Sequence, residues 1–342
     1  MSRSVLRVAV LFLGGTACAQ KVPLPQVAQR SAELTTLTAS GSPSFHLDAT
    51  VTSGGESGMD GTIEEYWVSP TKWRRKIRTP GFSQTTIVNG DVHYEKDEGD
   101  YYPASLHVLA EALLQPMSDP LLQMLGQSRV KLDFNRGMLK SNICDANQVR
   151  TGVPPAVNAI MLSVCFAGDS QAVSSITGPG YDVVFKDRQE FGKLLVAMDV
   201  ISGASPETKW EAKLNDLSPL TEIDETLFAA PENTPETRRL QVVLASEEEA
   251  RQLFKKLPDP DWPAVHQGRT SGVVTVYVST DATGRVREAW PLSSDNLEIG
   301  AAACAQMLNW NLGTRNPAEK YYQFETYFTF AFPTPVAGAK AK

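Results

Sequence analysis

Histidine and carboxylate side chains are the residues of this sequence that could carry out acid–base catalysis or bind a metal. The four histidines form no HExxH motif and do not share the spacing of zinc ligands with the cysteines. The sequence also contains no GxSxG elbow, no P-loop and no GxGxxG motif after a predicted strand. We therefore expect a protein that binds rather than catalyses, with no catalytic residue, no metal and no cofactor. The histidines are His46, His93, His107 and His266.

Neighbouring carboxylates occur in the sequence, but their placement does not favour acid–base chemistry. Glu64 and Glu65 are adjacent in a predicted strand, so their side chains point to opposite faces of the sheet. The run of residues 247–249 is three glutamates at the start of a predicted helix, where negative charge suits the helix dipole. We interpret that run as a solvated helix face.

The first 19 residues have the three regions of a secretory signal peptide. Arg3 and Arg7 precede the apolar run of residues 8–13, and small residues follow it. This run is far shorter than the roughly 20 residues that a membrane span requires. We predict cleavage after Ala19 and export to the periplasm of a Gram-negative cell. A lipoprotein anchored through Cys18 is the alternative.

The remaining cysteines fit an oxidising compartment. Cys144 and Cys165 lie in two predicted strands, and a disulfide between them would close a loop worth roughly 3 kcal/mol in the chain-entropy model. Cys304 lies in an alanine-rich segment that is predicted to be a buried helix. The alternative is that all three are ordinary reduced core residues.

The overall composition is that of a folded protein with two domains. The chain has 342 residues, of which 42% are hydrophobic and 21% charged, and its formal net charge is −7. A negative net charge argues against nucleic acid as the main partner, because phosphate binding requires a basic surface. No segment beyond the leader is long and apolar enough to predict a transmembrane span.

Residues 44–231 have the pattern of an antiparallel β-meander. Short β-branched or aromatic runs alternate with Gly, Pro and Asn-Gly turns. In KWRRKIRT, Trp73, Arg75 and Ile77 share one face, and four basic residues line the other face. Two helices are expected in SLHVLAEALL and DPLLQMLG, where leucines recur at helical spacing. We predict an α+β fold that begins with an antiparallel meander interrupted by two helices.

Residues 263–333 are predicted to fold as strand, turn, strand, helix, strand. The segments GVVTVYVSTDATGRVREAW, AAACAQMLNWNL and YYQFETYFTFAF carry this order. They resemble the C-terminal domain of TonB-type energy transducers, in which an Ala-rich helix ends in an aromatic-x-apolar step, here residues 310–312. The proline that usually follows this step is replaced by Gly313-Thr314.

The TonB resemblance implies a partner in the outer membrane or elsewhere in the envelope. In that family a peptide from the partner adds as a strand to the edge of the sheet, where unpaired backbone groups accept it. The last strand is the expected edge. The expected partner-binding residues are Gln323, Glu325, Tyr327, Thr329 and Ala331.

The first domain resembles, more loosely, the LolA-like periplasmic lipoprotein carriers. The segments FHLDATV, KWRRKIR, VNGDVHYEKDE and IDETLFAAPE carry the resemblance. It implies an antiparallel half-barrel sheet that is half-closed by lid helices and whose apolar cavity holds acyl chains, although the same residues could simply pack as core. The expected cavity residues are Phe45, Leu47, Val51, Trp67, Trp73, Ile77, Leu109, Leu113 and Leu122.

Two functional hypotheses follow. The first is an exported, non-enzymatic protein that docks to an envelope partner by strand addition at its C-terminal domain. The alternative is a carrier of lipid or lipoprotein acyl chains in the N-terminal half-barrel. The expected division is a signal peptide (1–19), a tail with a short helix (20–43), the LolA-like domain (44–231), a linker with a short helix (232–262), the TonB-like domain (263–333) and a flexible tail (334–342).

Overall fold

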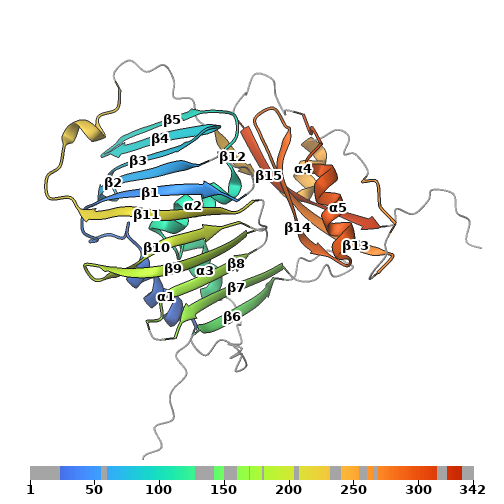
Figure 1. The fold of residues 1–342 in the computed structure, drawn as a ribbon, viewed down its shortest axis with the longest axis horizontal. Helices are drawn as coiled ribbons and strands as arrows, with labels where there is room; N and C mark the ends of the chain where they lie inside the picture. The colour runs from blue at the N-terminus through green and yellow to red at the C-terminus, as the bar shows by residue number, and fades with distance from the viewer. Residues whose placement is uncertain are drawn as a thin grey trace, which may run out of the picture.

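Two β-sheets, each with helices on one face, make up the described part of the chain (Figure 1). The computed structural model describes residues 24–54, 60–127, 142–149, 160–168, 170–178, 181–203, 208–231, 240–253, 260–264, 269–313 and 322–332. The predicted signal peptide, Cys18, His266 and the predicted C-terminal tail lie outside these residues.

The first sheet has eleven strands in the order β5-β4-β3-β2-β1-β11-β10-β9-β8-β7-β6, and every described neighbouring pair in it is antiparallel. It is an open sheet and not a closed barrel. The strands are β1 (Phe45–Ser53), β2 (Gly61–Ser69), β3 (Lys72–Thr79), β4 (Phe82–Asn89), β5 (Val92–Glu98), β6 (Asn142–Val149), β7 (Ile160–Ala167), β8 (Val173–Gly178), β9 (Tyr181–Phe191), β10 (Leu194–Ser202) and β11 (Trp210–Pro219).

Three helices cover one face of this sheet, which we call the inner face (Figure 1). They are α1 (Leu24–Thr35), α2 (Ala104–Leu114) and α3 (Asp119–Gln127), so both helices predicted after the first meander are confirmed. Helix α2 begins after Pro103, whose fixed φ suits a helix start, and ends just before Pro116. It buries eight of its eleven residues against the sheet, which makes it the main lid of the inner face.

The alternation of buried and exposed residues along β1, β2 and β3 sets the inner face. Ile63, Glu65 and Trp67 of β2 lie opposite Ile77, Arg75 and Trp73 of β3. The predicted face of β3 is therefore confirmed, because residues directly opposite each other in a ladder project to the same side. The outer face carries a smaller cluster in which Phe228 of the 3-10 helix η1 (Glu225–Phe228) packs on Ile87 and Tyr94.

The second sheet has the order β12-β15-β13-β14. Its elements are β12 (Gln241–Leu244), α4 (Glu247–Leu253), β13 (Gly272–Thr280), β14 (Val286–Ser294), α5 (Leu297–Met307) and β15 (Tyr322–Phe332). The order of β13, β14, α5 and β15 along the chain is the one predicted from the sequence. Asn296 caps α5 by accepting hydrogen bonds from the backbone N–H groups of Glu298 and Ile299.

The hairpin between β13 and β14 is held by Asp281. Its Oδ1 accepts hydrogen bonds from the backbone N–H groups of Thr283 and Arg285, at 2.9 and 3.1 Å. Gly284 has a φ of +83°, and a Cβ atom there would lie 2.1 Å from the carbonyl oxygen of Gly313. Only glycine fits this turn without displacing the backbone that follows α5.

The prediction that β15 is the free edge of the second sheet is wrong. β12 pairs with β15 in parallel, from Gln241 opposite Tyr322 to Leu244 opposite Glu325. Beyond β12, the Thr329 N–H donates to Oε1 of Glu247 and the Thr329 carbonyl accepts from Arg251, both in α4. β15 is therefore an interior strand of the second sheet. Of the predicted partner-binding residues, Gln323, Glu325 and Thr329 lie where β12 or α4 already contacts the strand. Tyr327 and Ala331 belong to the same strand.

The segment that was expected to be a linker also contributes to the second sheet. β12 supplies a strand to it, and Ala250 of α4 is fully buried in the core of the second sheet. Ala-rich α5 packs on β13 and β14 and buries Cys304, as the sequence predicted. Burial raises the pKa of the Cys304 thiol to about 12.

The β6–β7 ladder places Cys144 directly opposite Cys165. This is the register that a disulfide across neighbouring strands requires. The side chain of Cys144 lies outside the described residues, so the predicted bridge stays a prediction.

Candidate ligand-binding cavity

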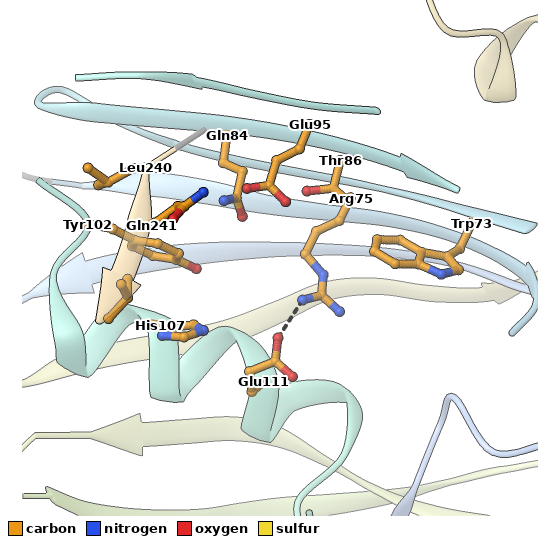
Figure 2. Close-up of a pocket in the computed structure, with 11 residues that line it drawn as sticks. Trp73, Arg75, Gln84, Thr86, Glu95, Tyr102, His107, Glu111, Leu240 and Gln241 are labelled. Atoms are coloured by element: carbon orange, nitrogen blue, oxygen red, sulfur yellow. Dashed lines mark hydrogen bonds and ion pairs between the residues drawn. The ribbon is translucent and has the colours of Figure 1, made fainter. Parts of the chain in front are cut away.

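A cavity of about 530 Å³ lies between the inner face of β3, β4 and β5 and the lid helix α2 (Figure 2). β12, which belongs to the second sheet, lies at the end of the cavity marked by Leu240 and Gln241, while Trp73 lies at the opposite end. Its lining is mainly polar and charged. The lining residues are Trp73, Arg75, Gln84, Thr86, Glu95, Tyr102, His107, Glu111, Leu240, Gln241 and Val242.

Arg75 joins the sheet to the lid helix at the centre of this cavity. Its Nε donates to Oε2 of Glu65 at 2.8 Å, and its Nη1 donates to Oε1 of Glu111 at 2.9 Å (Figure 2). The Glu65 side chain is fully buried, whereas 58% of the Glu111 side chain is exposed. The two carboxylates therefore differ: the pair with Glu65 is part of the interior, and the pair with Glu111 faces solvent.

Burial changes the acidity of Glu65. Removal from water raises the pKa of its carboxyl group to about 7, although the neighbouring Arg75 guanidinium lowers it in part. Its Oε1 has no hydrogen-bond partner within the described residues. The charge of this site is therefore sensitive to pH near neutrality.

Aromatic rings form two walls of the cavity. Tyr102 stacks on Phe82 with ring centroids 4.5 Å apart, and His107 of α2 lies 5.1 Å from the same tyrosine ring. On the other side of the guanidinium, the ring of Trp73 lies 5.5 Å from Cζ of Arg75, within the range of a cation–π contact. The cavity thus offers flat apolar surfaces beside a cation.

A buried carboxylate fixes the β12 end of the cavity. Asp97 of β5 is 2% exposed, and its Oδ2 accepts a hydrogen bond from the backbone N–H of Leu240. Its Oδ1 accepts from the side-chain amide of Gln84 at 3.0 Å. The chain that enters β12 is therefore attached to the first sheet as well as to the second.

The residues predicted to line an apolar cavity lie together but mostly pack as core. Most of them are at most 5% exposed and belong to one continuous hydrophobic cluster with the lid helices, so side chains fill the expected space. Trp73 is the member of the set that lines the cavity. The packed members are Phe45, Leu47, Val51, Trp67, Ile77, Leu109 and Leu113, and Leu122 packs against them in partly buried form.

The charged centre of the cavity has a signal in the sequence, in two charged residues that interrupt apolar positions. Glu65 stands between Ile63 and Trp67 on the inward face of its strand, and Arg75 stands likewise between Trp73 and Ile77. Charged residues at inward positions of two paired strands predict a buried ion pair. The contributions of His107 and Glu111 could not be found in this way, because they depend on how α2 lies on the sheet.

The described residues contain no group of three or more histidine, cysteine or acidic side chains that could hold a metal ion. Nδ1 of His46 lies 3.0 Å from Oδ2 of Asp216 on the outer face of the first sheet, which is the face opposite the cavity. No helix in the described ranges combines the length and apolar character needed to cross a membrane.

Comparisons with known proteins give distant structural likenesses. No protein-family model matches the chain, and no curated protein matches it. Among solved structures it is similar to a LolA superfamily protein from Nitrosomonas europaea, with 9% identity and a TM-score of 0.37 over 61% of this chain and 98% of that one. It is also similar to a DUF1329 family protein from Desulfovibrio piger, with 8% identity and a TM-score of 0.31 over 60% of this chain and 97% of that one.

Both likenesses cover nearly the whole of the other protein's chain, but at very low sequence identity. Their identities and TM-scores are too low to carry an argument about function, which has to be made from the cavity. The resemblance of the second domain to TonB-type transducers stays a prediction.

Proposed function

We propose that this protein is a carrier of an acyl-chain ligand, either a lipid or the acylated end of a lipoprotein. The observation that carries the proposal is the ion network of Glu65, Arg75 and Glu111, which crosses a mostly apolar layer beside a cavity of about 530 Å³. Burying a charge costs desolvation free energy, so an apolar pair would often be at least as stable at this position. We therefore infer that the charges serve a purpose beyond stability. An attachment point for the polar end of an amphiphile would be such a purpose.

The two carboxylates divide the work at Arg75. The fully buried Glu65 holds the guanidinium in place, and the half-exposed Glu111 occupies the side that faces solvent. A ligand with an anionic group can take the place of Glu111, because an exposed ion pair contributes at most about 1 kcal/mol. Its apolar part would then lie against the rings of Trp73 and Tyr102.

Replacement of Glu111 also explains how a long chain could be held. Glu111 belongs to α2, which covers the inner face with Leu106, Leu109 and Leu113. Exchange of Glu111 for the ligand removes one ionic link between Arg75 and α2, but the buried leucines still hold the helix on the sheet. The helix would therefore move only as the acyl chain replaces the leucine contacts and offsets their loss. We place the carrier in the periplasm, in accordance with the predicted signal peptide.

The test is extraction of natively exported protein with organic solvent, followed by mass spectrometry of the extract. We expect an acyl lipid in stoichiometric amount from the parent chain and from Arg74→Leu, whose substitution lies on the outer face. Glu65→Leu/Arg75→Met, which removes the buried carboxylate together with its cation and so should keep its stability, should return much less of it. An empty parent chain, or equal lipid from the folded double variant and from Arg74→Leu, would contradict the proposal.

A further inference from the structure

The cavity borders on a short segment that both domains share. Residues 100–103, here called the strap, follow β5 and lead directly into the lid helix α2. Tyr101 and Tyr102 are 7% and 5% exposed, so the strap is covered on both sides. The ring of Tyr102 is part of the cavity wall.

Gln323 of the second sheet binds the strap through both ends of its side-chain amide. Its Oε1 accepts from the backbone N–H of Tyr102 at 2.8 Å, and its Nε2 donates to the carbonyl oxygen of Tyr102 at 2.7 Å. The amide thus pairs with Tyr102 as a neighbouring strand would. Nε2 also lies 3.2 Å from Oγ of Ser279 and 3.5 Å from Oε1 of Glu325, and the whole side chain is fully buried.

Further contacts hold the strap on the second sheet. The backbone N–H of Ala282 donates to the carbonyl oxygen of Asp100 at 2.9 Å. The guanidinium of Arg287 lies 5.2 Å from the ring of Tyr101 and 4.0 Å from a carboxylate oxygen of Asp100. The β12 strand adds a second connection, because it pairs with β15 while Leu240 and Gln241 line the cavity.

We infer that Gln323 is a positioning residue of the ligand site, so that the site is built by both domains. It acts through Tyr102: it fixes the backbone from which the tyrosine ring enters the cavity and from which α2 begins. This inference rests on the proposed carrier function and adds to it, because it assigns the second domain a part in holding the ligand and the lid.

The hydrogen bonds of the buried Gln323 amide support a positioning role for this residue rather than a general role in stabilising the second sheet. A buried glutamine needs partners for its amide, and many partners within its own sheet would satisfy it. The two shortest hydrogen bonds of the Gln323 amide, at 2.8 and 2.7 Å, both go to Tyr102 of the first domain, which lines the cavity, whereas the contacts with Ser279 and Glu325 in its own sheet are longer. Losing the amide would leave the N–H and carbonyl groups of Tyr102 without these partners in a covered place, so the strap would move.

The test uses the full chain with the fluorescent fatty acid cis-parinaric acid as the probe. Gln323→Met keeps the size of the side chain and removes both hydrogen bonds to Tyr102. We expect its Kd for the probe to rise at least tenfold and the amides at the start of α2 to exchange hydrogen faster. Thr329→Val is the control, since it breaks a bond to Thr275 inside the second sheet and leaves the strap untouched.

A second variant keeps the test decisive where Gln323→Met does not fold. Gln323→Glu always retains an acceptor for the Tyr102 N–H, but it has a donor for the Tyr102 carbonyl only when protonated. The ratio of its Kd to that of the parent should therefore increase as the pH rises. The parent carries the same ionisable neighbours, so the ratio isolates position 323; these neighbours are Tyr101, His107, Tyr277, Arg287, Glu288 and Glu325.

The outcomes separate the inference from the function on which it rests. If the parent binds cis-parinaric acid and Gln323→Met or a pH-independent Gln323→Glu binds it equally well, Gln323 has no positioning role. Equal loss in Thr329→Val would attribute the effect to the sheet as a whole and would also overturn the inference. A parent chain that binds no probe contradicts the carrier function, and unchanged exchange in α2 then overturns the role of Gln323 independently.

Discussion

Glu65 and Arg75 lie directly opposite each other in the β2–β3 ladder, and their side chains meet at 2.8 Å beneath the lid helix. Neighbouring inward positions on both strands are apolar, with Ile63 opposite Ile77 and Trp67 opposite Trp73. The ion pair therefore lies between two apolar cross-strand pairs. Because Glu65 is buried there, its carboxylate depends on the neighbouring Arg75 guanidinium for stabilisation.

Removal of Arg75 should destabilise the protein strongly. Arg75→Met leaves the buried Glu65 carboxylate without its cation, which costs about 3–5 kcal/mol when one partner of a buried pair is removed. Urea denaturation measures the loss of unfolding free energy. Arg74→Met, on the outer face of the same strand, is the control and should change the stability by less than about 1 kcal/mol. The double variant Glu65→Leu/Arg75→Met should recover most of the loss; failure to recover would show that Glu65 is not the cause.

Stability should fall as the pH rises from about 5 to about 8. Burial between the domains raises the pKa of Glu288 from 4.5 to about 8. In this window the folded state retains a proton that the unfolded chain has lost, so deprotonation favours unfolding. Glu288→Gln should remove a few kcal/mol of this dependence, estimated from about 1.4 kcal/mol per pKa unit. Thermal unfolding at several pH values measures it, with the exposed Glu190→Gln as control; parallel curves for Glu288→Gln and the parent would contradict the assignment.

We predict a disulfide between Cys144 and Cys165 when the protein is produced in an oxidising compartment. Their opposite positions in the β6–β7 ladder suit a bridge, which would stabilise the fold by roughly 3 kcal/mol. Intact mass spectrometry with a thiol-alkylating reagent should label neither cysteine before reduction and both after it. Cys304 should react only on unfolding, because it is buried and its pKa is raised to about 12. Labelling of Cys165 in the unreduced native protein would exclude the bridge.

Two glycines with positive φ should respond very differently to alanine. At Gly284 a Cβ would collide with the backbone of Gly313, while at Gly313 itself a Cβ would meet nothing within 4 Å. Gly313→Ala should therefore cost only the left-handed backbone penalty of about 1–2 kcal/mol. Gly284→Ala should cost clearly more, because the backbone around residue 313 must also shift. Chemical denaturation of both variants checks this order, and equal losses would show that the turn tolerates the shift.

The sequence predicted the elements of this fold better than their neighbours in space. Alternation in β1–β5, leucine spacing in α2 and the turn between β13 and β14 are local patterns, and the predicted strands, helix and turn are confirmed. The pairing of β12 with β15 could not be predicted, because Gln241 and Tyr322 are distant in sequence and the strand has only four residues. For this reason the expected docking edge was misplaced.

The position of the open cavity depends on packing between elements that are distant in sequence. Alternation identifies which side chains face inward, but it does not show whether a helix fills the space above them. Leu109 and Leu113 of α2 belong to the continuous hydrophobic core over the sheet, and the cavity that remains open is lined by Arg75. Finding the polar site from sequence would have required reading Glu65 and Arg75 as exceptions to an apolar pattern.

The strand order of the large sheet has a consequence for how the chain folds. Each of its two halves, β5 to β1 and β11 to β6, joins strands that are close in sequence, and the halves meet at the single pair β1–β11. That pair begins with Phe45 opposite Pro219. Since distant pairings form slowly, we expect two local meanders to form first and the β1–β11 seam to close last. During synthesis the two half-sheets would thus stay unjoined until the chain reaches residue 219.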